Sequence, residues 1–274
     1  MVSNATIVCI CISLLISLIL PILIPIIFGM KYKKKGMVSA WMLGAAGFFI
    51  TQMLLRIPVL TVLQKTRWYT NFSQNHLFGY VLFLAVTAAV FELAGRYSVA
   101  KVLLKNPGYR RSLLAGLGHG GIEAIAIVGI TMVNNLAYAS MINAGTFQDT
   151  LVSAAAAGVD VSTLELIGQQ LLNTAPGMFL LSGVERLLAM TAHVAMSMLV
   201  CYGIAHKKAG ICILLCLGIH TLMDLTAGIS LVLPAAAAYP VIYAILIAMA
   251  VFSLFVIREL FRRWKKEVSH DSEK

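Results

Sequence analysis

"IVCICISLLISLILPILIPIIFG", residues 7–29, contains no charged side chain, and the basic stretch "KYKKK", residues 31–35, follows it after a single Met. A helix needs about 20 consecutive apolar residues to cross the hydrocarbon core of a bilayer, so this run is long enough to span one. It has neither the basic segment before it nor the small-residue cleavage site after it that a signal peptide carries. We therefore expect a membrane-spanning helix that the protein retains.

The rest of the chain has the same apolar character. Of its 274 residues, 60% are hydrophobic and 12% are charged, and the mean hydropathy is +0.89, which excludes soluble enzymes. Further apolar runs lie near residues 37–62, 77–104, 112–142, 177–205, 209–233 and 238–261. The sequence predicts an all-α fold, with residues 1–274 forming one integral membrane domain: a polytopic transmembrane bundle of seven helices in the lipid bilayer.

The net charge of +10 predicts an orientation in the membrane rather than a nucleic-acid partner, because most Lys and Arg residues lie at the ends of apolar runs. They gather after the first, third, fifth and seventh runs: Lys31, Lys33, Lys34 and Lys35; Lys101, Lys105, Arg110 and Arg111; Lys207 and Lys208; Arg258, Arg262, Arg263, Lys265 and Lys266. Cytoplasmic loops carry an excess of Lys and Arg. We therefore expect the N-terminus outside, the C-terminus inside and no nucleic-acid binding.

The longest segment between apolar runs, residues 143–176, carries no Lys or Arg and is expected on the outer side. It contains "STLELIGQQLL", in which Ser162 and Glu165 fit a capping box at the start of a helix. Leu164, Ile167 and Leu171 share one face of that helix. We expect an outer loop with a short amphipathic helix, which serves either as a packed connector or as a lid over a substrate site.

Ionisable side chains inside the apolar runs are the strongest functional signal. Each costs about 2.5–3.5 kcal/mol at the centre of a spanning helix on insertion scales, so it is a functional hypothesis by default. The third to sixth runs all contribute such residues, which makes residues 77–233 the expected catalytic core. The candidate catalytic residues are Glu92, Arg96, His119, Glu123, Glu185, His193, His220 and Asp224.

The spacing of these residues predicts that they meet. Three pairs are four residues apart: Glu92 with Arg96, His119 with Glu123, and His220 with Asp224. Residues at this spacing lie on one helix face in adjacent turns, and each face would point into the bundle. The alternative is structural, with arginines that neutralise buried carboxylates and histidines that hydrogen-bond between helices. Arg56, in the second run, is expected to snorkel or to pair across helices.

Glycines at positions 116, 118, 120 and 121 surround His119. They remove side chains from the helix surface beside the histidine, at a cost in helix propensity. Because glycine has no side chain, either a neighbouring helix or the backbone of a ligand can approach closely at these positions. We therefore expect tight packing around His119.

Carboxylates, histidines and arginines shielded from bulk water suit a hydrolytic reaction. Either Glu92 or Glu123 can be the general base that activates water, and a positive charge nearby can stabilise the oxyanion. Three histidines could instead hold a catalytic zinc ion, with His119, His193 and His220 as its ligands. The residues favour activation of water without a cofactor, and zinc is the alternative.

The pieces "FELAGR", "GLGHGGIEAI", "VERLLAMTAH" and "GIHTLMD" resemble the YhfC family of bacterial membrane proteins, and the resemblance covers essentially the whole chain. This family is similar to the CAAX-processing (CPBP) and PrsW proteases, which are grouped as glutamic-type intramembrane proteases and sometimes described as metalloproteases. The motifs of the wider group are E-E-x-x-x-R, F-x-x-x-H and H-x-x-x-N/D. They fall on Glu92 and Arg96, on His119, and on His220 and Asp224, with Phe91 and Ala115 departing from the pattern.

The resemblance implies an intramembrane endopeptidase of the bacterial cytoplasmic membrane, whose substrate is a membrane protein or a lipid-anchored peptide. A proton-coupled transporter is the rival from another class, because intramembrane Glu, His and Asp also relay protons. The sequence has no inverted repeat and no matched pair of broken helices, which argues against that class. A third alternative is an assembly subunit whose polar residues only pack.

Overall fold

The computed structural model describes residues 1–32, 36–104 and 107–271, and every regular element in these ranges is a helix. In chain order the elements are α1 (Asn4–Leu14), η1 (Leu15–Ile19), α2 (Leu20–Tyr32), α3 (Met37–Phe48), η2 (Phe49–Arg56), α4 (Ile57–Leu63), α5 (Arg67–Asn75), α6 (Leu77–Ser98), η3 (Val99–Leu103), α7 (Tyr109–Ala124), η4 (Ile125–Gly129), α8 (Ile130–Ala144), α9 (Phe147–Ala156), α10 (Ser162–Asn173), α11 (Pro176–Ala205), α12 (Ala209–Val232) and α13 (Ala235–Asp271). The η elements are π-helical stretches that continue the neighbouring α-helices.

Seven helical segments of the described chain are long and apolar enough to cross a membrane. They are Asn4–Phe28, Met37–Leu63, Leu77–Lys101, Tyr109–Ala144, Pro176–Ala205, Ala209–Val232 and Ala235–Lys265. Each coincides with one of the apolar runs in the sequence. The prediction of an all-α, multi-pass integral membrane protein with seven spanning helices is therefore confirmed.

The chain divides into two compact units. Unit 1 comprises Met1–Ile22 and Ala124–Leu187, and unit 2 comprises Leu23–Glu123 and Leu188–Lys274. In unit 1, α1 packs along α8 and η1 packs along η4. The apolar core of this unit includes Ile10, Met132, Leu171 and Phe179.

Helix α10 of unit 1 does not begin in the way the sequence predicts. Ser162 is its first helical residue, and Val161 at the cap makes no side-chain hydrogen bond. Asp160 instead accepts a hydrogen bond of 3.0 Å from the Ser162 N–H, which lowers the pKa of the Asp160 carboxyl. The predicted capping box is wrong, because Asp160 already satisfies an N–H that the start of the helix leaves open.

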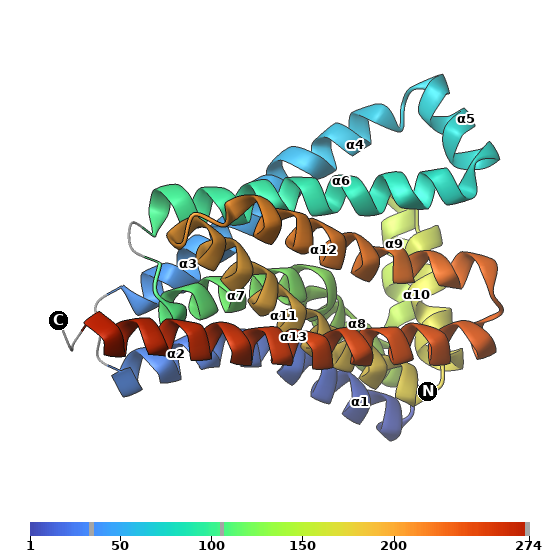
Figure 1. Ribbon diagram of the computed structural model, residues 1–274. Coiled ribbons are helices and arrows are strands. Elements are labelled where there is room, and N and C mark those ends of the chain that lie inside the picture. Colours follow the sequence, from blue (N-terminus) through green and yellow to red (C-terminus); the bar gives the residue numbers. More distant parts are fainter. Residues whose placement is uncertain (33–35, 105–106, 272–274) are drawn as a thin grey trace. The chain divides into compact units, whose positions relative to one another are not determined.

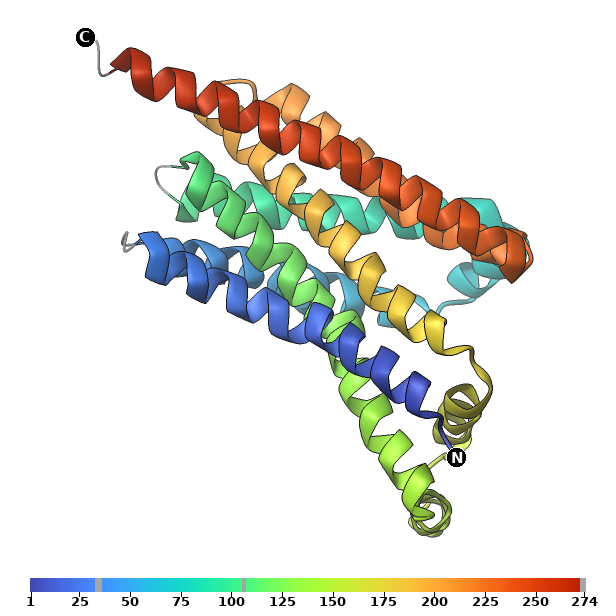
Figure 2. The same ribbon diagram turned by 90° about the horizontal axis from the view of Figure 1, so that it is seen from below.

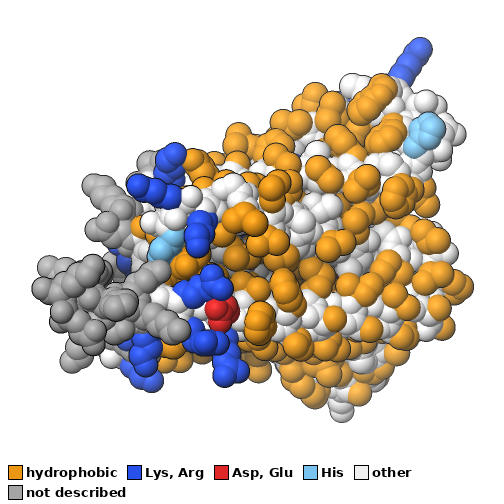
Figure 3. Space-filling model, viewed as in Figure 1, with side chains coloured by type: hydrophobic (Ala, Val, Ile, Leu, Met, Phe, Trp, Pro, Cys, Tyr) orange, Lys and Arg blue, Asp and Glu red, His pale blue; other side chains and the backbone are white. Residues whose placement is uncertain are grey.

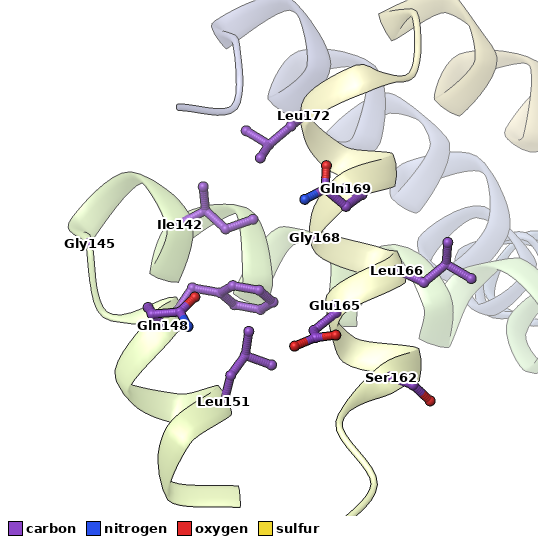
Figure 4. Close-up of a pocket in the computed structure, with 11 residues that line it drawn as sticks. Ile142, Gly145, Gln148, Leu151, Ser162, Glu165, Leu166, Gly168, Gln169 and Leu172 are labelled. Carbon is purple, nitrogen blue, oxygen red and sulfur yellow. The ribbon is translucent and has the colours of Figure 1, made fainter. Parts of the chain in front are cut away.

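A pocket of about 610 Å³ lies between α9 and α10 in unit 1 (Figure 4). Leu151 from α9 and Glu165 from α10 face one another across it. A Cβ atom on Gly168 would lie 2.8 Å from Cε1 of Phe147, so the missing side chain lets the two helices meet at this point. None of the eight candidate catalytic residues lines this pocket.

In unit 2, α12 packs against α6 and α13, as Figures 1 and 2 show, and α6 also packs against α3 and η2. The approach of α3 to α6 depends on two glycines. A Cβ atom on Gly95 of α6 would lie 2.6 Å from the carbonyl oxygen of Gly47 on α3. Small residues let spanning helices come this close. The second spanning segment therefore reaches the part of α6 that carries Glu92 and Arg96.

Most of the Lys and Arg side chains visible in Figure 3 gather toward one end of the face, one projects at the opposite end, and hydrophobic side chains cover most of the rest. This distribution is typical of a protein whose basic residues remain at one membrane surface. Of the basic residues that predict the orientation, residues 33–35 and 105 lie outside the described residues. The placement of the N-terminus outside stays a prediction.

Candidate active site and metal centre

Glu92 of α6 stands at the centre of a buried polar cluster in unit 2. Its Oε2 atom lies 3.0 Å from Nε2 of His119 on α7, and 3.5 Å from Nε2 of His220 on α12. The same oxygen lies 3.8 Å from Nδ1 of His193 on α11. All four side chains are buried. Four helices thus converge on one carboxylate oxygen.

Arg96, one turn after Glu92, lies inside the same cluster. Its Nη2 atom is 3.3 Å from Oε2 of Glu92 and also contacts Nδ1 of His193, while Nη1 is 3.4 Å from Nδ1 of His220. A guanidinium can only donate hydrogen bonds, so both Nδ1 atoms act as acceptors. Each of these two imidazoles therefore carries a proton on Nε2. Arg96 neutralises the charge of Glu92 and sets both tautomers.

Glu123 enters the cluster from α7, one turn after His119. Its Oε2 atom lies 2.7 Å from Nε2 of His193, the nitrogen that carries the proton. The two atoms are at ion-pair distance without the alignment of a hydrogen bond. A carboxylate beside this nitrogen favours the tautomer that leaves Nδ1 of His193 free of a proton.

His220 and Asp224 form a pair on α12. Nε2 of His220 lies 3.5 Å from Oδ2 of Asp224, the same distance as from Oε2 of Glu92. The Asp224 side chain is 29% exposed, against 3% for Glu92 and 10% for Glu123. Among the acidic residues of the cluster, Asp224 is therefore the one most open to an approaching molecule.

Glycines of α7 bring the site together, as the sequence suggests. A Cβ atom on Gly118 would overlap the backbone carbonyl of Trp41 on α3, and one on Gly120 would lie 2.8 Å from Cβ of His193 on α11. Both positions therefore exclude any larger residue unless the backbone moves. Helix α7 is held between α3 and α11, and His119 faces Glu92 as a result. The glycines serve helix packing.

Sequence reasoning missed one polar neighbour of the cluster. Gln52 of η2 donates a hydrogen bond of 2.9 Å from its Nε2 to Oε1 of Glu92. Arg56 follows four residues later and pairs across helices, with Nη2 donating to the carbonyl oxygen of Leu84 at 2.7 Å. The pairing across helices expected for Arg56 is therefore confirmed, and its spacing from an amide inside an apolar run is the signal that could have found Gln52.

The structure brings seven of the eight candidate residues into this cluster: Glu92, Arg96, His119, Glu123, His193, His220 and Asp224. The eighth, Glu185, belongs to unit 1. There its Oε1 atom lies 2.5 Å from Nη2 of Arg186. A charge-neutralising pair accounts for this contact, and a catalytic role for Glu185 stays a prediction.

Glu92, His119 and His193 form a group that could hold a metal ion. One ligand atom from each lies within 4.8 Å of the others, and all three residues are buried. A carboxylate with two imidazoles is a ligand set of catalytic zinc sites, which keep a further position open for water or substrate. The set expected from the sequence was His119, His193 and His220. In the structure the third member of the group is Glu92 rather than His220, whose Nε2 lies 3.5 Å from Oε2 of Glu92.

These features define a multi-pass membrane protein with a buried carboxylate and histidine centre of a kind that can hold a metal ion. The family model described as "YhfC intramembrane metalloprotease" matches residues 16–264, and the chain belongs to this family. The chain is also similar to "Uncharacterized membrane protein YhfC" of Bacillus subtilis (strain 168), at 29% identity over 240 residues, which are 86% of this chain and 91% of the relative. No solved structure matches it. The family resemblance of the sequence motifs is confirmed.

Proposed function

We propose that this protein is an intramembrane metalloprotease that hydrolyses peptide bonds within or near the bilayer. The observation that carries the proposal is the group formed by Glu92, His119 and His193, whose ligand atoms lie within 4.8 Å of one another. The family description supports the same activity. Zinc, the alternative in the sequence interpretation, therefore replaces cofactor-free activation of water as the favoured chemistry.

Glu92, His119 and His193 would hold the ion through one carboxylate oxygen and two imidazole nitrogens. When bound, such an ion supplies a Lewis acid that polarises the scissile carbonyl and activates water. Arg96 contacts Nδ1 of His193, the nitrogen that lies 3.8 Å from Oε2 of Glu92. One lone pair cannot serve both a guanidinium and a metal ion, so this nitrogen would bind an ion only without the Arg96 contact.

The remaining members of the cluster act on protons. Glu123 holds the proton of His193 on Nε2, and carboxylates in this position orient metal-binding histidines. Asp224, whose Oδ2 lies 3.5 Å from Nε2 of His220, is placed to take a proton from the attacking water and to return it to the leaving amine. Buried Arg96 stabilises negative charge that develops on the substrate.

The substrate in this proposal is a membrane protein or a lipid-anchored peptide. It reaches the cluster from the side of Asp224, because that side chain is the most exposed acidic group of the site. All the proposed catalytic residues fall within residues 77–233, which we propose as the catalytic core. With the N-terminus outside and the C-terminus inside, the basic loops would lie in the cytoplasm.

The proposal is tested with the full-length protein in detergent or liposomes and a peptide substrate that contains a transmembrane segment. Cleavage should stop after treatment with a zinc chelator and return when zinc is added back. Cleavage that continues unchanged after complete removal of metal would contradict a metalloprotease. Proton uptake into liposomes without any cleavage would favour the transporter instead.

A further inference from the structure

Gln52 is held in a single orientation between Arg56 and Glu92. It is buried, at 9% exposure, on the π-helical stretch η2. Its Oε1 atom accepts a hydrogen bond of 3.4 Å from Nη1 of Arg56, and its Nε2 atom donates one of 2.9 Å to Oε1 of Glu92. Arginine can only donate, so its presence fixes which end of the amide faces Glu92.

Arg56 is itself anchored to α6, which makes the arrangement rigid. Its Nη2 atom donates to the carbonyl oxygen of Leu84 at 2.7 Å, and its Nε atom donates to Oγ1 of Thr87 at 3.3 Å. The guanidinium thus joins η2 to the helix that carries Glu92. π-Helical stretches are rare and often occur at functional sites, and this one places both polar residues against α6.

The two oxygens of Glu92 have different surroundings because of this contact. Oε1 faces the Gln52 amide at 2.9 Å, whereas Oε2 faces Arg96 and the three histidines at 3.0–3.8 Å. We propose that Gln52 is a positioning residue that occupies one oxygen of Glu92 and presents the other alone to the metal ion. This inference rests on the proposed metalloprotease function, since it concerns the same carboxylate.

Gln52 contributes in this way only if its amide proton matters, rather than its volume. Partners that orient a metal ligand are typically worth about 10–100-fold in metal affinity. A residue that merely fills space would affect folding and leave the affinity of the folded protein unchanged. Metal affinity and coordination geometry therefore separate the two roles.

The experiment uses the full-length protein in detergent, stripped of metal, with zinc and Co²⁺ as probes. Gln52→Met keeps an unbranched side chain of similar length but removes the donor. Thr226→Val is the matched control, because Thr226 is also buried, at 7% exposure, and its hydroxyl bonds only to the Met223 carbonyl among the hydrogen bonds of the described chain. Zinc dissociation constants come from competition with a chromophoric chelator, and circular dichroism checks the fold.

Gln52→Met should bind zinc about 10–100-fold more weakly than the wild type, whereas Thr226→Val should match it. The Co²⁺ form of Gln52→Met should absorb visible light more weakly than the wild-type Co²⁺ form. Without the amide, both oxygens of Glu92 are free to bind the ion, and a higher coordination number weakens the absorption. If Gln52→Met does not fold, Gln52→Asn keeps an amide but is one methylene too short, and it should show the same loss.

Wild-type zinc affinity and an unchanged Co²⁺ spectrum in a folded variant would overturn the inference and leave the metal site standing. A wild-type protein that binds no zinc would instead overturn the proposed function, and the inference with it.

Discussion

Nε2 of His119 lies 3.0 Å from Oε2 of Glu92, although the two residues are 27 positions apart in the chain. Both side chains are buried, and Phe48 packs edge-on against the His119 ring. A buried carboxylate needs partners of this kind, because leaving it unpaired costs several kcal/mol. The contact joins α6 to α7. The same Glu92 oxygen also lies 3.3–3.8 Å from Arg96, His193 and His220, so it is the common neighbour of these side chains.

Glu92→Gln should lower the cleavage rate by at least about 100-fold, since an amide does not bind zinc as a carboxylate does. Glu123→Gln should cost less, about 10–100-fold, because Glu123 acts through His193. Initial rates on a transmembrane peptide measure both effects, and circular dichroism confirms that the variants fold. A larger loss in Glu123→Gln than in Glu92→Gln would contradict the ligand role given to Glu92 and the positioning role given to Glu123.

Arg96→Met should tighten zinc binding by at least about tenfold. The guanidinium lies 3.3 Å from Oε2 of Glu92, so its removal would relieve its repulsion of a bound cation, and it frees Nδ1 of His193. Arg96→Lys keeps the charge and should change the affinity less. Weaker zinc binding in folded Arg96→Met would show that the guanidinium supports the metal site rather than competing with the ion.

Gly118→Ala should destabilise the protein by about 1–3 kcal/mol, the usual effect of forcing a methyl group into a packed interior. The new methyl group would overlap the backbone of Trp41, which cannot give way as a side chain can. Gly218→Ala on α12 is the control, since a Cβ atom there meets nothing within 4 Å. Thermal unfolding in detergent compares the two. Equal midpoints would contradict the tight packing of α7 against α3.

The orientation of the chain can be tested on intact cells with an inserted epitope. An epitope after Gly158, in the loop between α9 and α10, should be reached by an antibody from outside. An epitope at the C-terminus should be reached only after the membrane is made permeable. The opposite pattern would show that the basic loops do not face the cytoplasm.

Much of the fold follows from the sequence because lipid restricts the choices. A spanning segment must satisfy its backbone hydrogen bonds internally, so a long apolar run such as residues 7–29 has almost no alternative to a helix. The amino-acid sequence carries no comparable signal of the division into two units. Contacts such as that of η1 with η4 depend on which helix faces meet, and apolar runs of nearly uniform composition do not encode this in a readable pattern.

The site was predictable where charge made it conspicuous. Glu92, His119 and His220 were found because an ionisable residue in an apolar run is costly and therefore needs a reason. Gln52 was missed because a neutral amide carries a smaller cost and a weaker signal. That Glu92, rather than the predicted His220, joins His119 and His193 in the group that could hold a metal ion depends on side-chain directions that only the packed helices determine.

Metal content is the most direct test of the central claim that Glu92, His119 and His193 hold a catalytic zinc ion. Elemental analysis of the protein, purified without chelators, should find about one zinc ion per chain, as expected for a single mononuclear site. The double variant Glu92→Gln with His119→Ala should contain almost none, and Glu185→Gln, altered in the other unit, should keep the wild-type content. Wild-type protein that cleaves its substrate without bound metal, or a double variant that keeps its zinc, would contradict the account.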